Sequence, residues 1–258
     1  MDKENKNINS LVNAHKKLLD DLIMHGKTIK LQFDTNENKI YSVFLERQIS
    51  LAKSIEILLR KKQFYDACIL ASSLAENFIL VKYLIVYEKI DDFVDFHCIE
   101  TFPMIKQNPK LQQEALEVIE THNLRRFLKQ RKTKGKIDLL DSNNYIAPWK
   151  NIQAMVDQIV KKGDADIKSL KFNYDILCSY KHSGPYTLLS RKFGAPPEND
   201  AMIVLGITCM VLLHQFAVVA QNPNSIFFQK QVKLKEKFEH LMETVKQFEE
   251  NRKKEHFS

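Results

Sequence analysis

Several polar side chains near the end of one predicted helix could do chemistry. They come just before a Ser-Gly-Pro break in the segment 172–185, and they are Asn173, Tyr174, Ser179, Lys181 and His182. An imidazole changes charge near neutral pH, so His182 could act as a general acid or base, while Lys181 could stabilise a phosphate or an oxyanion. The alternative is structural: His182 and the residue after it only cap the helix end.

A carboxylate, Glu76, lies in the middle of a segment that is apolar nearly all round, residues 64–87. Such a carboxylate needs a cation or a hydrogen-bond donor when it is buried. Two interpretations remain open. Glu76 pairs with a Lys, Arg, Tyr or His of a neighbouring helix for structural reasons, or it orients and charges His182. Tyr83 lies seven residues further on, on the same helix face, and could join the same polar cluster.

Positive charge is concentrated in one run, and no acidic residue lies between His122 and Ile137. The whole chain of 258 residues has a formal net charge of +7, so the position of the charge says more than its total. One interpretation is a phosphate-contacting patch that binds nucleic acid; the other is a solvated helix end and loop. The predicted contact residues are Arg125, Arg126, Lys129, Arg131 and Lys132.

Other kinds of site have little support in the sequence. The eight His residues are dispersed without a pair at ligand spacing, which predicts no metal site and no metal cofactor. No Gly-rich phosphate loop and no GxSxG elbow occurs, so nucleotide-binding α/β folds and acyl-transfer enzymes are disfavoured. The four cysteines show no CxxC spacing and are expected to be reduced residues of the core.

The composition predicts an all-α fold, a bundle of about eight helices. With 6 Gly and 7 Pro, the chain has few residues for the tight turns of a many-stranded sheet. We expect one helical domain over residues 1–258 with its core at about 40–220, although two cores remain open. Apolar periodicity predicts the main helices at 9–25, 43–62, 64–87, 109–124, 148–163, 166–180, 201–220 and 225–252, with a shorter helix that ends before Pro103.

Three predictions concern location and assembly. The polar start of the chain carries no secretory signal, which predicts a cytoplasmic protein. Residues 201–220 are long enough to span a bilayer, but Thr208, His214 and Gln215 favour a buried core helix, so membrane binding is the less favoured interpretation. The C-terminal helix at 225–252 has an apolar seam for packing on this domain or for a homodimer.

A resemblance adds to this picture. The segment 71–76 reads ASSLAE and the segment 174–182 reads YDILCSYKH. Together they resemble a bacterial helical family of unknown function that is similar to the HEPN (higher eukaryotes and prokaryotes nucleotide-binding) superfamily, over roughly residues 40–220. The resemblance implies a HEPN-like helical fold. Many proteins of that superfamily are dimeric, metal-independent ribonucleases of toxin–antitoxin or antiviral defence systems.

Carried over residue by residue, the resemblance gives His182 the place of the family His, Ser179 that of the Ser, Tyr174 that of the Tyr and Glu76 that of the central-helix Glu. The superfamily's nuclease motif also has an Arg that is separated from its His by four to six intervening residues. This chain has an Asp, an Ile and a Leu at 175–177, and Ser72 at another position where related sequences often have an Arg. RNA cleavage would therefore require Lys181 or the basic run to supply the cation.

Two functions from different classes follow. The first is a domain that binds RNA or nucleotide, with metal-independent endoribonuclease activity in which His182 is the acid/base and Lys181 contacts phosphate. The second is a non-catalytic sensor or interaction component of a defence system, with a protein partner encoded in the same operon. In the second case the same polar cluster only fixes the helices.

Overall fold

The structure is a computed structural model that describes residues 36–129 and 137–181, with scattered positions in 9–20 and 204–211. Several predicted features lie outside the described residues. They are His182, Arg131, Lys132, the C-terminal helix at 225–252 and most of the helix at 201–220.

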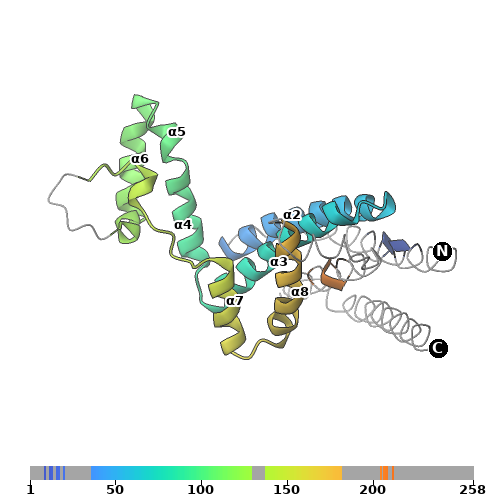
Figure 1. Ribbon diagram of the computed structural model, residues 1–258. Coiled ribbons are helices and arrows are strands. Elements are labelled where there is room, and N and C mark those ends of the chain that lie inside the picture. The colour runs from blue at the N-terminus through green and yellow to red at the C-terminus, as the bar shows by residue number, and fades with distance from the viewer. Residues whose placement is uncertain are drawn as a thin grey trace, which may run out of the picture.

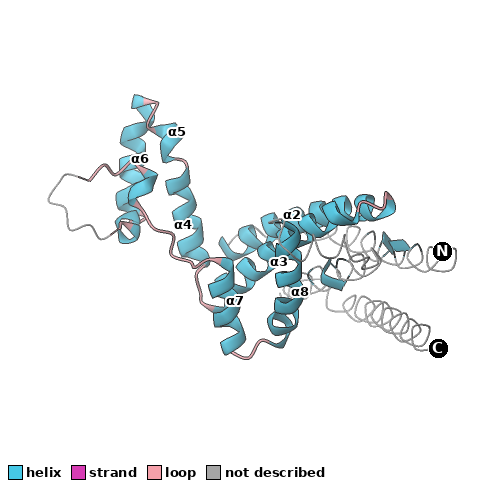
Figure 2. Ribbon diagram, in the orientation of Figure 1, coloured by secondary structure: helices cyan, strands magenta, loops and turns pink. Residues whose placement is uncertain are grey.

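The described part of the chain is helical, which confirms the all-α prediction. It contains seven α-helices and two short 3₁₀ helices, and no strand within the described ranges (Figure 2). The elements are α2 (Asn36–Arg60), α3 (Phe64–Val86), α4 (Ile90–Glu100), α5 (Phe102–Ile105), α6 (Pro109–Thr121), η1 (Leu124–Phe127), η2 (Ser142–Asn144), α7 (Ile152–Lys161) and α8 (Ala165–Lys181).

Side-chain caps set several helix starts. The Asn151 side chain accepts a hydrogen bond from the backbone N–H of Ala154, which is why α7 begins at Ile152 and not at the predicted residue 148. Asp164 caps α8 in the same way by accepting from the N–H of Ile167 at 2.9 Å. Between the two helices Gly163 has a φ of +88°, a left-handed conformation that costs a glycine little.

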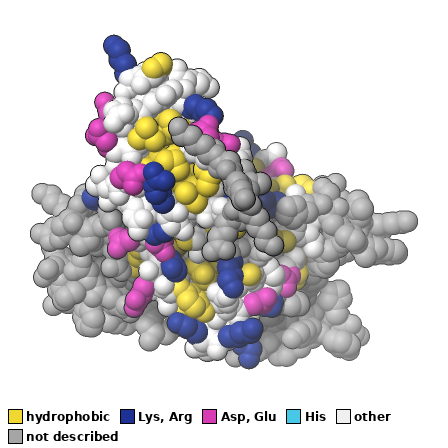
Figure 3. Space-filling model, turned by 90° about the vertical axis from the view of Figure 1, so that its left-hand side faces the viewer, with side chains coloured by type: hydrophobic (Ala, Val, Ile, Leu, Met, Phe, Trp, Pro, Cys, Tyr) yellow, Lys and Arg dark blue, Asp and Glu magenta, His cyan; other side chains and the backbone are white. Residues whose placement is uncertain are grey.

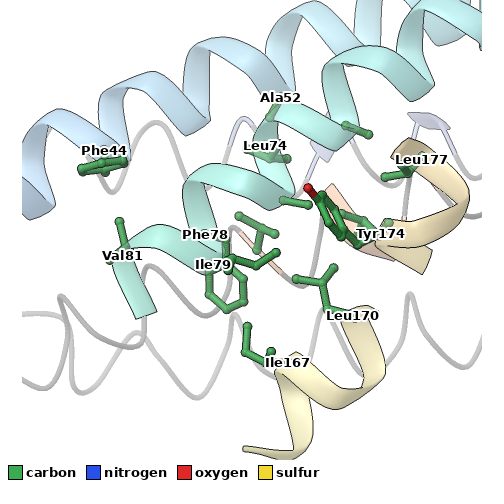
Figure 4. Close-up of a cluster of buried hydrophobic side chains, with 14 of the residues drawn as sticks. Phe44, Ala52, Leu74, Phe78, Ile79, Val81, Ile167, Leu170, Tyr174 and Leu177 are labelled. Atoms are coloured by element: carbon green, nitrogen blue, oxygen red, sulfur yellow. The ribbon is translucent and has the colours of Figure 1, made fainter. Parts of the chain in front are cut away.

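Four helices, α2, α3, α7 and α8, form a bundle around the central α3 (Figure 1). The 23 residues of α3 are apolar nearly all round, so neighbours can cover it on several faces. Leu74, Phe78 and Ile79 of α3 are almost fully buried, and Figure 4 shows Phe78 and Ile79 on the side that faces Leu170 and Ile167 of α8. Apolar packing therefore sets the position of α8 on α3.

Residues 90–147 form an arm with a second hydrophobic core. The arm consists of α4, α5, α6, η1 and η2, and it stands away from the bundle in Figure 1. Its core includes the buried Ile99, Phe102, Ile119 and Leu124. Trp149 contacts both cores. Its ring centroid lies 5.0 Å from that of Phe93 in the bundle core and 5.0 Å from that of Phe96 in the arm core.

Among the described helices, α3 is long and apolar enough to cross a bilayer. Half of its most apolar stretch is buried inside the chain. The core helix of a globular domain has the same length and composition, so these two properties do not identify α3 as a membrane segment. A cytoplasmic location stays a prediction.

Candidate functional site

Glu76 of α3 contacts two polar side chains of α8. The Lys181 ammonium donates to both carboxylate oxygens, at 2.9 Å to Oε1 and 2.8 Å to Oε2. The Tyr174 hydroxyl donates to Oε1 at 3.2 Å. Tyr174 and Lys181 are seven residues apart, so they lie two turns apart on one face of α8. Glu76 thus has a cation and a hydrogen-bond donor from the neighbouring helix. The sequence analysis named Lys181 and Tyr174 as candidate site residues, and it expected a Lys, Arg, Tyr or His of a neighbouring helix beside Glu76.

Two further contacts hold α8 on α3. Near the start of α8, Asp164 accepts from the Lys82 ammonium at 3.0 Å. Near its end, the Tyr65 hydroxyl donates to the carbonyl of Tyr180 at 3.0 Å, and the two rings meet edge to face. Opposite charges along α3 therefore match the two ends of α8, which fits the antiparallel packing of the two helices.

Cys178 joins Glu76, Tyr174 and Lys181, and these four residues are called the Glu76 cluster below. The Cys178 thiol lies close enough to Tyr174, Glu76 and Lys181 for these groups to affect its pKa. Burial raises its pKa, and the Glu76 carboxylate acts in the same direction. Cys178 is therefore a protonated thiol at neutral pH and a poor nucleophile.

Tyr174 stays protonated for a similar reason. Burial strongly raises the pKa of its phenol, and the neighbouring Cys178 and the charge of Glu76 raise it further. Figure 4 shows the ring among apolar side chains between α3 and α8, near Leu177. A neutral phenol keeps its proton, so Tyr174 is a permanent donor to the Glu76 carboxylate.

The Glu76 cluster reaches solvent. The Glu76 side chain is 25% exposed and that of Lys181 is 33% exposed, so the ion pair is only half-buried. Lys181 is the last residue of α8, and His182 follows it in the sequence. A ligand in solution can therefore approach the charged groups of the cluster.

The remaining predicted residues near the site have local partners. Ser179 donates to the carbonyl of Asp175, one turn earlier in α8, at 3.3 Å. Tyr83 is buried, and its ring lies 4.8 Å from that of Tyr87. Ser72 is also buried and donates to the Ile69 carbonyl at 2.7 Å. The side chain of Asn173 lies outside the described residues.

In the basic run, two arginines are paired with carboxylates of the arm. Arg125 donates to Glu120 at 2.7 Å, and Arg126 donates to both Asp92 and Asp95, at 3.2 Å and 2.7 Å. The face in Figure 3 shows Lys and Arg side chains interspersed with Asp and Glu.

Lys129 donates to the carbonyl of Asn143 at 2.7 Å, so this cation too has a partner within the arm. These contacts neutralise part of the run. Nucleic-acid binding by Arg125, Arg126 and Lys129 stays a prediction.

Metal ligands do not gather in the described part of the chain. No group of three or more His, Cys, Asp and Glu side chains there could hold a metal ion. Among these residues, His122 pairs with one carboxylate: its Nδ1 lies 3.0 Å from Asp95 Oδ1.

Sequence reasoning missed two polar residues of the bundle. Cys178 had a signal, because it lies four residues from Tyr174 and hence one turn along the same face. Gln48 of α2 had a weaker one: it shares a face with the buried Phe44 and Ala52. Gln48 is fully buried, and neither side-chain polar atom has a hydrogen-bond partner among the described residues.

The comparisons with known proteins support one part of the resemblance, membership of a family of unknown function. No curated protein and no solved structure matches the chain. Residues 38–201, well over half of the sequence, match a protein family described as a family of unknown function, DUF5677. That range includes α2 except for its first two residues, all of α3 to α8, and the whole Glu76 cluster. The chain belongs to the DUF5677 family.

Proposed function

We propose that this chain is a HEPN-like domain that binds RNA and cleaves it without a metal ion, with His182 as the acid/base. The supporting observation is the Glu76 cluster, where a carboxylate, a phenol and an ammonium from two helices meet at a partly exposed position. Because His182 directly follows Lys181, an acid/base group lies next in the chain to a cation that a phosphate can contact.

The proposed reaction is transesterification within RNA. The ribose 2′-OH gives a proton to His182 and attacks the adjacent phosphorus, and the bond from phosphorus to the 5′ oxygen breaks. The leaving oxygen takes a proton from the imidazolium, which restores the neutral ring. The products are a 2′,3′-cyclic phosphate and a 5′-OH. Lys181 stabilises the charge on the phosphate oxygens, and DNA resists cleavage because it has no 2′-OH.

The other predicted residues have supporting roles in this proposal. Glu76, Tyr174 and Ser179 position the end of α8, since each has a contact on that helix. The basic run contacts backbone phosphates, and its residues are Arg125, Arg126, Lys129, Arg131 and Lys132. For Arg125 and Arg126 a phosphate must replace a carboxylate that already holds the guanidinium. A homodimer and a toxin–antitoxin or antiviral setting belong to the same proposal.

The test is cleavage of mixed cellular RNA in EDTA by the purified chain. His182→Ala is expected to abolish cleavage. His97→Ala is the matched control, because His97 lies on α4 of the arm with a 62% exposed side chain, and it is expected to cleave like the parent chain. Cleavage that survives His182→Ala, or no cleavage by the parent chain, contradicts the proposal.

A second candidate is a non-catalytic sensor or interaction component with a protein partner from a defence operon. The observation that favours it is internal charge pairing: Lys181 is held by Glu76, and Arg126 by two aspartates. In this case Lys181→Ala lowers the melting temperature without changing affinity for RNA. A lower affinity for RNA with an unchanged melting temperature contradicts it.

A further inference from the structure

The Lys181 ammonium is occupied in the ligand-free chain. Its nitrogen lies 2.9 Å from Oε1 and 2.8 Å from Oε2 of the Glu76 carboxylate, so its charge is already paired. A phosphate that binds Lys181 must therefore compete with Glu76 for that charge. The charge of Glu76 also repels an approaching anion. Access to Lys181 consequently depends on whether Glu76 can give it up.

The pair is open enough to exchange partners. With side chains 25% and 33% exposed, both groups can be rehydrated when they separate. Ion pairs with this much exposure contribute little net stability, because water screens their attraction. The released carboxylate also keeps a donor, since the Tyr174 hydroxyl already binds its Oε1. Separation therefore leaves no buried charge without a partner.

On the basis of the proposed function, we propose that Glu76 is a displaceable counter-ion, which holds Lys181 in the ligand-free chain and releases it to a backbone phosphate of RNA. This role and a purely supporting role predict opposite changes in RNA affinity when the Glu76 carboxylate is removed. A carboxylate that only supports the site weakens binding when it is removed. A carboxylate that competes with the phosphate strengthens binding when it is removed.

Binding can be measured without cleavage by using a fluorescein-labelled 2′-O-methyl oligonucleotide, whose blocked 2′ oxygen cannot attack phosphorus. Glu76→Gln keeps the shape of the side chain and an acceptor for Tyr174, but it removes the charge. Fluorescence anisotropy is expected to show binding about two- to fivefold tighter than that of the parent chain. Asp175→Asn is the matched control, because it removes an exposed carboxylate of α8, and its affinity is expected to stay unchanged.

A double substitution assigns the gain to Lys181. If Glu76 acts by occupying Lys181, then Glu76→Gln in a Lys181→Ala background gives no gain over Lys181→Ala alone. Circular dichroism melting of each variant checks the fold, and Glu76→Ala is expected to change affinity in the same direction as Glu76→Gln.

The outcomes separate this inference from the proposed function. If the parent chain binds the oligonucleotide and Glu76→Gln binds it equally or more weakly, the counter-ion role is overturned while RNA binding stands. A gain that persists in the Lys181→Ala background overturns it as well. No binding by any variant overturns both the counter-ion role and RNA binding.

Discussion

The bundle and the arm use polar groups in different ways. In the bundle, the Glu76 cluster is half-exposed and lies between two long helices that apolar side chains already pack together. In the arm, Arg126 ties short elements together: it donates to two aspartates of α4 and to the carbonyls of His122 and Asn123. Its guanidinium also lies over the ring of Phe127.

This difference shows where polar groups are needed for the fold. The 3₁₀ helix η1 has four residues, so it has few backbone hydrogen bonds of its own and needs side chains to hold it. By contrast, α3 has 23 residues and α8 has 17, and their apolar faces suffice to pack them. The Glu76 cluster is therefore the polar group that the fold needs less, which favours a role toward a ligand.

The largest expected effects come from the two cores. Phe78→Ala in the bundle should lower the free energy of unfolding by about 3–5 kcal/mol, because it leaves a cavity at a side chain that is 1% exposed. Phe102→Ala removes an equally buried ring from the arm. If the arm has its own core, hydrogen exchange should speed up mainly within residues 90–147. Faster exchange throughout the bundle in Phe102→Ala would contradict the separation of the two cores.

A smaller effect is expected at Arg126. Arg126→Ala should lower the free energy of unfolding by about 1–2 kcal/mol, because two carboxylates and two carbonyls lose a donor at a partly exposed site. Arg125→Ala is the control, and chemical denaturation should show no resolvable change, since its pair with Glu120 is solvent-exposed. Equal losses for the two substitutions would sink the structural role assigned to Arg126.

At Tyr174 we expect a still smaller effect at neutral pH. Tyr174→Phe should cost about 0.5–1.5 kcal/mol, because the carboxylate of Glu76 loses a donor while the ring stays in place. Urea denaturation at pH 7 measures this difference. A Tyr174→Phe chain as stable as the parent would show that the hydrogen bond to Glu76 adds nothing to the fold.

The smallest expected effect is a change in the same stability difference, between the parent chain and Tyr174→Phe, at alkaline pH. The fold raises the pKa of Tyr174 above the ordinary value of 10.0, so the unfolded chain loses its phenol proton first as the pH rises. The stabilisation is fully present below about pH 10 and is lost above it. The difference between the parent chain and Tyr174→Phe should therefore stay constant up to about pH 10 and narrow as the pH rises above it. A difference that stays constant above about pH 10 as well would contradict the raised pKa.

Much of the bundle could be predicted from the sequence. The continuous apolar pattern identified α3, and the expectation that a buried carboxylate needs a partner led to the contacts of Glu76. In the arm, the helix that begins at Pro109 and a shorter helix before Pro103 were predicted, but the sequence left open whether the chain has a second core. The pairing of Arg126 with Asp92 and Asp95 was missed. Asp92 lies 34 positions and Asp95 lies 31 positions before Arg126, and sequence spacing does not show which distant segments meet.

The central claim is that the residues around the end of α8 cleave RNA through its 2′-OH. The most direct measurement compares two oligonucleotides of one sequence, one with ribose and one with 2′-O-methyl ribose, incubated with the purified chain in EDTA. The account predicts that only the ribose oligonucleotide is cut, that its fragments end in 2′,3′-cyclic phosphate, and that His182→Ala leaves it intact. Cleavage of both oligonucleotides, or of neither, would contradict the claim.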